Sequence, residues 1–271
     1  MRNEFFGWYF KCQSPTQTLA VIPAHHGGSR SVQLISDDGA WNFSDCGSCH
    51  FSRDGFRLEL CENGNCAVGE VKFSPLSPLK YDIMGSFRFV PFMECRHSVL
   101  SMRHRVDGEI SVNGKAYVFS GALGYIEGDR GTSFPGEYAW TQCFFEGGSL
   151  MLSVAEIPLG PFNFTGVICA ILLNGKEYRL ATYLGARAVK IADGEIVIRQ
   201  GKYTFTATLI EKAAHPLAAP VGGNMLRIIR ESAACRASYK LEKGGKALLD
   251  FVSDRASFEY EYGGRNEQTC Q

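Results

Sequence analysis

Residues 201–210 read Gly-Lys-Tyr-Thr-Phe-Thr-Ala-Thr-Leu-Ile, an alternation of apolar side chains with Lys and Thr. A period of two residues predicts a β-strand with one buried face. Short runs rich in Val, Ile, Phe, Tyr and Thr recur along the chain, for example at 56–60, 68–73, 167–173 and 196–199. No stretch has the pattern of a long amphipathic helix. We therefore predict an all-β protein.

Turn signals separate these runs at short, even intervals, and the chain contains 30 Gly. Asn113-Gly114 and Asn174-Gly175 are the strongest hairpin signals. About twenty short antiparallel strands exceed the roughly eight of one small barrel, so two barrels or curled sheets in tandem are expected. We place their boundary near residue 132, giving a first barrel over 1–132, a second over 133–262 and a disordered tail over 263–271. The longest loops are expected at 75–78 and 134–136.

Charge and composition exclude several function classes. The 271 residues carry 28 Lys and Arg against 28 Asp and Glu, and 45% are hydrophobic. Zero net charge argues against a protein that mainly coats nucleic acid or an anionic membrane, while the apolar content suffices for a core. No apolar run approaches the ~20 residues of a membrane span, and residues 1–8 lack the apolar stretch of a signal peptide. We expect a soluble, cytoplasmic protein without an integral membrane segment or nucleic-acid partner.

The ten cysteines raise the question of metal and haem sites. A reducing cytoplasm predicts free thiols. Cys46, Cys49, Cys61 and Cys66 form a possible four-thiolate zinc set, although the second pair has loose spacing. Cys46 to His50 also matches the haem c attachment pattern, which functions outside the cytoplasm. The favoured interpretation is small, packed thiols with no metal and no cofactor. Phosphate-binding loops and Gly-x-Ser-x-Gly elbows are lacking too.

A family resemblance extends this prediction. Residues 124–142 read Gly-Tyr-Ile-Glu-Gly-Asp-Arg-Gly-Thr-Ser-Phe-Pro-Gly-Glu-Tyr-Ala-Trp-Thr-Gln. This segment resembles the tocopherol cyclase family, which carries Gly-Tyr-x-Glu-x-Asp/Asn-Trp-Gly, then Ser/Gly-Phe-Pro, then Trp-x-Gln. Residues 6–11 and 92–104 are similar to further family segments, and the resemblance spans about residues 5–262. Arg130 stands where the family has Trp, and Phe6 where it has Glu, so the substrate is expected to differ.

The resemblance implies two tandem lipocalin-like antiparallel β-barrels, the fold of the wider relatives, carotenoid hydratases and β-barrel Diels–Alderases. It implies an isomerase, specifically an intramolecular lyase, that closes a chromanol ring on a prenylated hydroquinone or another hydrophobic small molecule. Acid-assisted closure protonates an alkene and lets a hydroxyl trap the cation. Such a site needs a carboxylic acid in an apolar surround, excluded water and aromatic faces beside the cation.

Glu127 and Asp129 are the predicted catalytic acids, because they share one face of an extended strand. The competing interpretation is that they pair with Arg130 or cap a loop. Tyr138 is the third catalytic candidate, and Tyr138 and Gln142 would orient the hydroxyl of the substrate by hydrogen bonds. Trp140 and Gln142 lie an even number of residues from Tyr138, so all three are expected to face one way.

The remaining candidates would bind the substrate or relay a proton. Trp8 and Tyr9 fall on opposite faces of a strand, so at most one of them lines a given cavity. Lys11 shares the face of Tyr9 and is expected to be solvated. His25 and His97 are proton-relay candidates. The full set of predicted substrate-binding residues is Trp8, Tyr9, His25, His97, Tyr125, Trp140 and Gln142.

Two other functions remain open. A lipocalin-like carrier would bind a hydrophobic molecule without chemistry, and it would leave Glu127 and Asp129 exposed to water. An interaction module would have barrels filled by side chains. An acid buried away from bulk water would favour the enzyme.

Overall fold

A computed structural model describes residues 4–90, 93–159 and 162–263. In this part of the chain, 19 strands and two short 3-10 helices follow one another, which confirms the all-β prediction. Their bounds are β1 (Phe5–Gln13), β2 (Thr18–His26), β3 (Ser29–Ser36), β4 (Ala40–Phe43), β5 (His50–Phe51), β6 (Gly55–Glu62), β7 (Asn65–Phe73), η1 (Gly85–Phe89), β8 (Cys95–Val112), β9 (Lys115–Gly131), β10 (Tyr138–Phe145), β11 (Gly148–Leu159), β12 (Phe162–Leu173), β13 (Lys176–Ala181), η2 (Thr182–Leu184), β14 (Arg187–Ala192), β15 (Glu195–Gln200), β16 (Tyr203–Glu211), β17 (His215–Val221), β18 (Asn224–Lys243) and β19 (Lys246–Tyr260). Apart from Gly263, the predicted tail lies outside the described residues.

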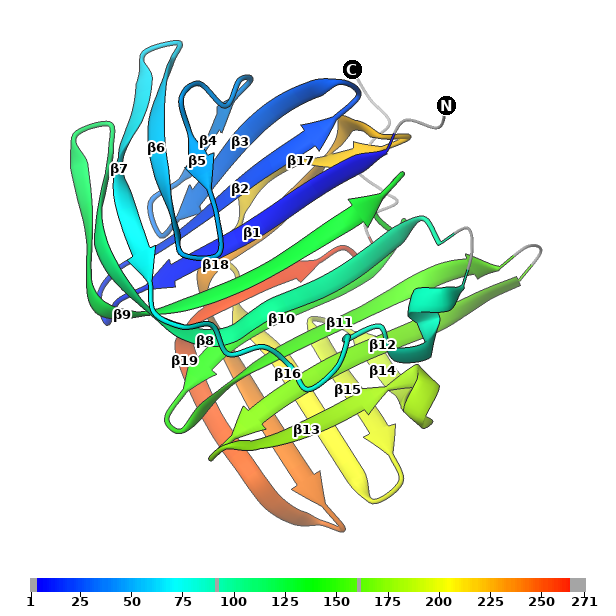
Figure 1. Cartoon of the computed structure of the whole chain (residues 1–271). Helices are drawn as coiled ribbons and strands as arrows, with labels where there is room; N and C mark the ends of the chain where they lie inside the picture. Colours follow the sequence, from blue (N-terminus) through cyan, green and yellow to red (C-terminus); the bar gives the residue numbers. More distant parts are fainter. Residues whose placement is uncertain (1–3, 91–92, 160–161, 264–271) are drawn as a thin grey trace. The chain divides into compact units, whose positions relative to one another are not determined.

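The strands form two antiparallel sheets (Figure 1). The first has the order β4-β3-β2-β1-β9-β8-β7-β6-β5, and the second β13-β12-β11-β10-β19-β18-β16-β15-β14, with β17 paired to β18. Each sheet curls until strands from its two ends approach each other, β4 near β6 and β12 near β14. Two curled antiparallel sheets in tandem match the predicted fold class.

Contacts divide the chain into two compact units. The first runs to Phe134 and also includes His215–Ile228, and the second begins at Pro135 and resumes at Ile229. The sequence division placed 215–228 in the second barrel. Hydrogen bonds attach this segment to the first unit instead, because the Gln33 side chain bonds both the carbonyl and the amide N–H of Ala218 (2.8 and 2.7 Å).

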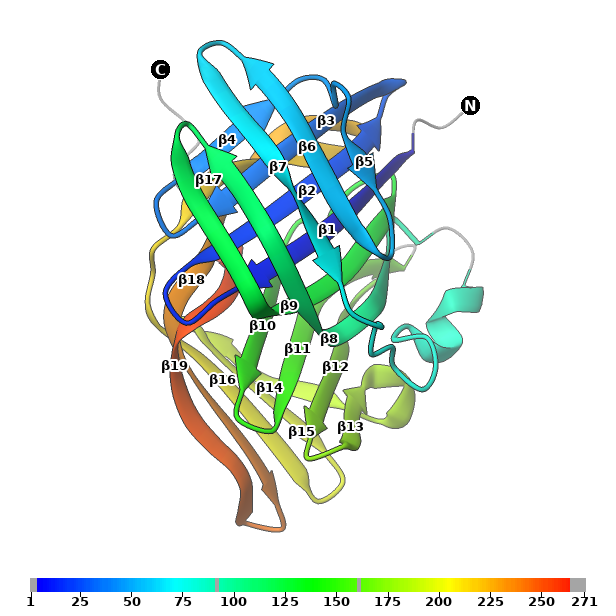
Figure 2. The ribbon, with the colours of Figure 1, turned by 60° about the vertical axis from the view of Figure 1, so that its left-hand side comes forward.

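Hairpin turns form where Asn-Gly pairs predicted them. Asn113 and Gly114 (φ 51° and 84°) join β8 to β9, and Asn174 and Gly175 (φ 49° and 75°) join β12 to β13. Positive φ at both central residues matches the right-handed twist of the flanking strands. The long hairpins β8–β9 and β18–β19 bend along their length (Figure 2), where register shifts interrupt their pairing.

Each unit packs its own apolar core inside its curled sheet. The first core includes Phe10, Phe56 and Ile126, and the second includes Phe205, Tyr239 and Phe258. These side chains lie on the inner faces of the curled sheets, and the residues that alternate with them along each strand lie on the other faces.

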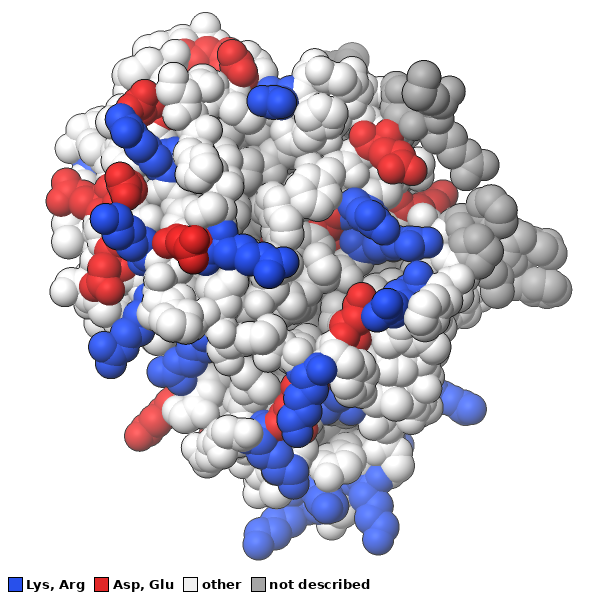
Figure 3. Space-filling model, viewed as in Figure 1, with Lys and Arg blue, Asp and Glu red and all other residues white. Residues whose placement is uncertain are grey.

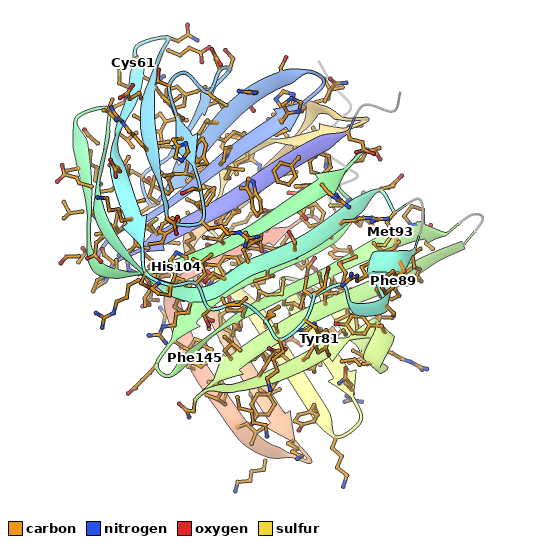
Figure 4. The ribbon with its side chains drawn as sticks, viewed as in Figure 1. Cys61, Tyr81, Phe89, Met93, His104 and Phe145 are labelled. Atoms are coloured by element: carbon orange, nitrogen blue, oxygen red, sulfur yellow. A yellow bond between two sulfur atoms is a disulfide. The ribbon has the colours of Figure 1, made fainter. Side chains whose placement is uncertain are left out.

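The hairpin β6–β7 corrects the cysteine prediction. Cys61 and Cys66 face each other across the Asn63-Gly64 turn and form a disulfide (Figure 4). Their sulfurs are therefore not available for the four-thiolate zinc set, and they are not the free thiols that a cytoplasmic location predicted. Cys46 and Cys49 are free and partly buried, and burial raises the pKa of both thiols.

No helix in the described part of the chain is both long enough and apolar enough to cross a membrane.

Candidate functional site

Strands β1, β8 and β9 present a second buried face opposite the core of the first unit. Phe10 and Ile126 point into the core, whereas Tyr9, Tyr125 and Glu127 alternate with them and point the other way. Tyr9 lies directly opposite Glu127 in the β1–β9 register. These three residues are only 7%, 0% and 4% exposed. The face is thus polar, aromatic and shielded from water.

His97 lies between the two predicted catalytic acids. Its Nδ1 is 2.9 Å from Oδ1 of Asp129, and its Nε2 is 3.1 Å from Oε2 of Glu127. The Tyr125 hydroxyl donates a 2.5 Å hydrogen bond to the same Glu127 oxygen, and the Cys95 thiol lies 3.5 Å from Asp129. The side chains of His97 and Glu127 are 10% and 6% exposed, and that of Asp129 is 22% exposed. The common face predicted for Glu127 and Asp129 is confirmed, and their partner is His97.

The charges of this cluster favour a protonated imidazole. Burial acts to lower the pKa of His97, but the Asp129 and Glu127 carboxylates and their hydrogen bonds together raise it well above its ordinary value. Burial, followed by the Glu127 charge, raises the pKa of Tyr125 well above its usual range. Burial, followed by the Asp129 charge, raises the pKa of the Cys95 thiol well above its usual range. Each of these three groups therefore keeps its proton near neutral pH.

A metal ion is a second possible occupant of the cluster. One ligand atom each from His97, Glu127 and Asp129 lie within 4.8 Å of one another. However, the two carboxylates contact opposite ring nitrogens of His97. A single ion can bind only one of these nitrogens, so the observed contacts suit a clamped imidazolium better than a chelate.

Two glycines of the 124–131 segment permit close packing on the core side of β9. A Cβ on Gly124 would lie 2.2 Å from Nε2 of His104, and a Cβ on Gly128 would lie 2.7 Å from Cε3 of Trp8. Both rings therefore lie directly on the backbone of β9. This contact keeps the strand that carries Glu127 close to its neighbours.

We expect Gly128→Ala to destabilise the protein by about 1–3 kcal/mol, because the rigid Trp8 ring has to move. Gly136→Ala is the matched control, since no atom lies within 4 Å of a Cβ at that position. Urea unfolding measures both variants, and equal stabilities would contradict the packing described here.

His104 is a buried histidine of the core side (Figure 4). It is 5% exposed, its Nδ1 contacts the Ser101 hydroxyl at 2.9 Å, and its ring packs edge-on against Phe73. Burial lowers the pKa of His104 to about 4. Because the folded-state pKa is depressed, the unfolded chain binds the proton more readily.

We therefore expect His104 to reduce stability by roughly 3 kcal/mol as the pH falls from 6.5 to 4. His104→Gln should remove this part of the acid sensitivity, while the exposed His50→Gln should leave it intact. Unfolding free energies at pH 7, 5 and 4 measure the difference, and parallel curves for wild type and His104→Gln would show that this expectation is wrong.

The other motif residues belong to the second unit. Tyr138, Trp140 and Gln142 occupy alternate positions of β10, opposite in direction to Ala139 and Cys143 of the core, which confirms their predicted common face. All three are buried. The Tyr138 hydroxyl donates a hydrogen bond to the carboxylate of Glu259.

Three predicted placements need correction or restriction. Trp8 packs on the core side, with Phe6 (5.0 Å between ring centroids) and over Gly128, and so does not share the face of Glu127. His25 is exposed and lies opposite Phe6 in the β1–β2 register, away from the cluster. Lys11 was expected to be solvated but is 1% exposed, since the face it shares with Tyr9 is buried.

Sequence reasoning missed two acids of the second unit. Glu231 and Glu259 pair across β18 and β19, and they are 1% and 8% exposed. Trp140 lies opposite Glu259 in the β10–β19 register. The sequence shows that Glu259 alternates with the apolar residue Phe258. This pattern predicts that the Glu259 side chain is solvated, unless the outer face of the strand is also covered.

Comparisons with known proteins support the fold. No protein-family model and no curated protein matches the chain. Among solved structures, CghA with Sch210972 is similar at a TM-score of 0.63 and 9% identity, over 96% of this chain and 89% of that one. The structure of CghA alone is similar at a TM-score of 0.63 and 10% identity, over 96% of this chain and 88% of that one. A putative AttH from Nitrosomonas europaea is similar at a TM-score of 0.52 and 9% identity, over 97% of this chain and 93% of that one. At these identities the likeness establishes the architecture over nearly the whole chain and not the activity.

Proposed function

We propose that this protein is a ring-forming isomerase, similar in chemistry to a tocopherol cyclase, that acts on a prenylated or other apolar substrate. The observation that carries the proposal is the clamped His97, held between Glu127 and Asp129 on a buried strand face. A hydrophobic carrier has no need of such a proton-holding cluster. The fold is compatible with the proposal, since CghA of the same architecture was solved with Sch210972.

The proposed reaction matches what the cluster can do. When a substrate hydroxyl adds to an alkene, a C–O and a C–H bond form while the O–H bond and the alkene π bond break. No oxidant, reductant or net proton is consumed. Glu127 and His97 need only donate one proton to the alkene and recover one from the hydroxyl. The raised pKa of His97 keeps that proton in the cluster at neutral pH.

Neighbouring side chains supply the other requirements of the reaction. Tyr9 places an aromatic ring opposite Glu127, where it would stabilise a developing cation. Tyr125 fixes one oxygen of Glu127 by its hydrogen bond. The low exposure of Tyr9, Tyr125 and Glu127 limits access of the water that would otherwise trap the cation.

Native mass spectrometry and solvent extraction of the purified protein test the proposal first. We expect a bound prenyl-type molecule, and conversion of a prenylated hydroquinone to a chromanol of unchanged mass. Release of a bound molecule without any turnover would support the carrier instead. A bare chain that takes up no hydrophobic probe would contradict both functions.

A further inference from the structure

One end of the second unit carries four hairpin turns that meet in two pairs. The turn after β15 meets the turn after β18, because the Gly244 amide donates to the Lys202 carbonyl at 2.8 Å. The turn after β12 meets the turn after β10, because the Asn174 amide donates to the Gly147 carbonyl at 2.9 Å. Antiparallel pairing of β10 with β19 sets both pairs of turns at the same end. We call these turns and their flanking residues the lysine end.

Lysines dominate this end of the unit. Lys176, Lys202, Lys243 and Lys246 are all exposed and flank three of the four turns, while the fourth carries Glu146. In Figure 3 the blue side chains gather over the hairpin tips of this unit. None of the four lysines takes part in an ion pair within the part of the chain that the structure describes. The zero net charge of the whole chain conceals this local excess.

Other charged groups near the lysine end do not cancel the excess. Glu177 and Glu242 are neutralised by their own partners, Arg179 at 2.8 Å and Lys240 at 3.0 Å. Arg187 and Arg199, which pair across β14 and β15, add further positive charge. The acids that remain are Glu146 and Asp250. The balance at this end is therefore clearly positive.

Aromatic rings lie directly beneath the lysines. The Lys176 ammonium lies 4.8 Å from the ring centroid of Tyr178, and that of Lys243 lies 5.4 Å from Tyr203. The two tyrosine rings are 6.1 Å apart. Phe145 (labelled in Figure 4) and Phe251 are also partly exposed here, with centroids 5.1 Å apart. The ammonium groups are therefore outermost at this end, with the tyrosine rings between them and the core.

We propose that the lysine end docks on an anionic phospholipid surface. The lysine ammonium groups contact headgroup phosphates and carboxylates, and the attraction is electrostatic. Nucleic acid fits less well, because the tyrosine rings that would stack on bases are already covered by ammonium groups. This surface is separate from the proposed reaction, so either proposal can fail without the other.

Vesicle flotation of the full-length protein tests the docking. We expect binding to vesicles of phosphatidylcholine with 30% phosphatidylserine at about 0.1 M salt, and loss of binding near 0.5 M as the charges are screened. Pure phosphatidylcholine vesicles should not bind. Each lysine near an anionic surface contributes a factor of roughly five.

Charge-matched variants locate the docking surface. Lys202→Glu with Lys246→Glu should weaken vesicle binding at least 25-fold. The control is Lys190→Glu with Lys212→Glu, which changes the net charge equally at the far ends of β14 and β16 and should change binding less than twofold. Equal loss in both variants, no binding by the wild type, or tighter binding to a short DNA duplex than to the vesicles would each overturn the proposal. Folding of both variants is checked by their thermal unfolding.

Discussion

Replacing His97 with Gln lowers the free energy of unfolding by about 3–5 kcal/mol at pH 7, the largest stability effect that we expect. The substitution removes the positive charge between Glu127 and Asp129 and leaves one buried and one partly buried carboxylate without their counter-charge. Urea unfolding measures the loss. His25→Gln, at an exposed histidine, should change stability by less than about 0.5 kcal/mol.

The pH dependence of this effect has a definite sign. The folded-state pKa of His97 is raised, so the folded protein binds its proton more tightly than the unfolded chain. The resulting stabilisation is complete below pH of about 6.5 and is lost as the pH rises through the folded-state value. The difference in unfolding free energy between wild type and His97→Gln should therefore become smaller in alkaline solution. A loss no greater than that of His25→Gln, or a difference that grows with pH, would contradict the clamped imidazolium.

Replacing Glu127 with Gln lowers the rate of ring closure by about 100- to 10,000-fold, the range expected when a positioned acid–base group is removed. Gln keeps the shape of the side chain and still accepts the Tyr125 hydrogen bond, but it cannot exchange a proton with His97 or the substrate. The measurement is single-turnover formation of the chromanol, with the prenylated hydroquinone as substrate.

Two readouts separate catalysis from folding in this experiment. Glu127→Gln leaves the His97–Asp129 pair in place, so its unfolding free energy should fall less than that of His97→Gln. Extraction should still recover the bound apolar molecule. Glu59→Gln, at an exposed acid of the same unit, is the matched control. A rate within threefold of wild type would exclude Glu127 from the reaction, whatever the state of the fold.

Local sequence predicted the architecture well because strand periodicity and turn chemistry act over a few residues. The alternation at 203–209 and the Asn-Gly turns at 113–114 and 174–175 specify strands and hairpins without reference to the rest of the chain. The common face of Glu127 and Asp129 follows from the same period.

The Cys61–Cys66 disulfide was not predicted, for a different reason. Cys61 and Cys66 lie opposite each other across a predicted turn, but an assumed reducing compartment outweighed that geometry.

Burial of the outer strand faces could not be predicted from periodicity. Lys11 and Glu259 alternate with core residues, and such positions are solvated when a sheet has only one covered face. Their exposures of 1% and 8% show that the face opposite each core is covered as well. Only the complete fold decides that, since it depends on segments distant in the sequence.

The meeting of His97 with the two acids shows the division between sequence and tertiary structure most clearly. By itself, the sequence determined an all-β chain, the β8–β9 hairpin and the shared face of Glu127 and Asp129. Counted from the Val112–Lys115 pair at the turn, unbroken pairing would set His97 opposite Arg130, on the wrong face. Register shifts in the hairpin set it opposite Asp129 instead. A slip of one residue reverses the face of every later side chain, and bulges of this kind are stabilised by packing across the whole sheet, as where His104 lies on Gly124.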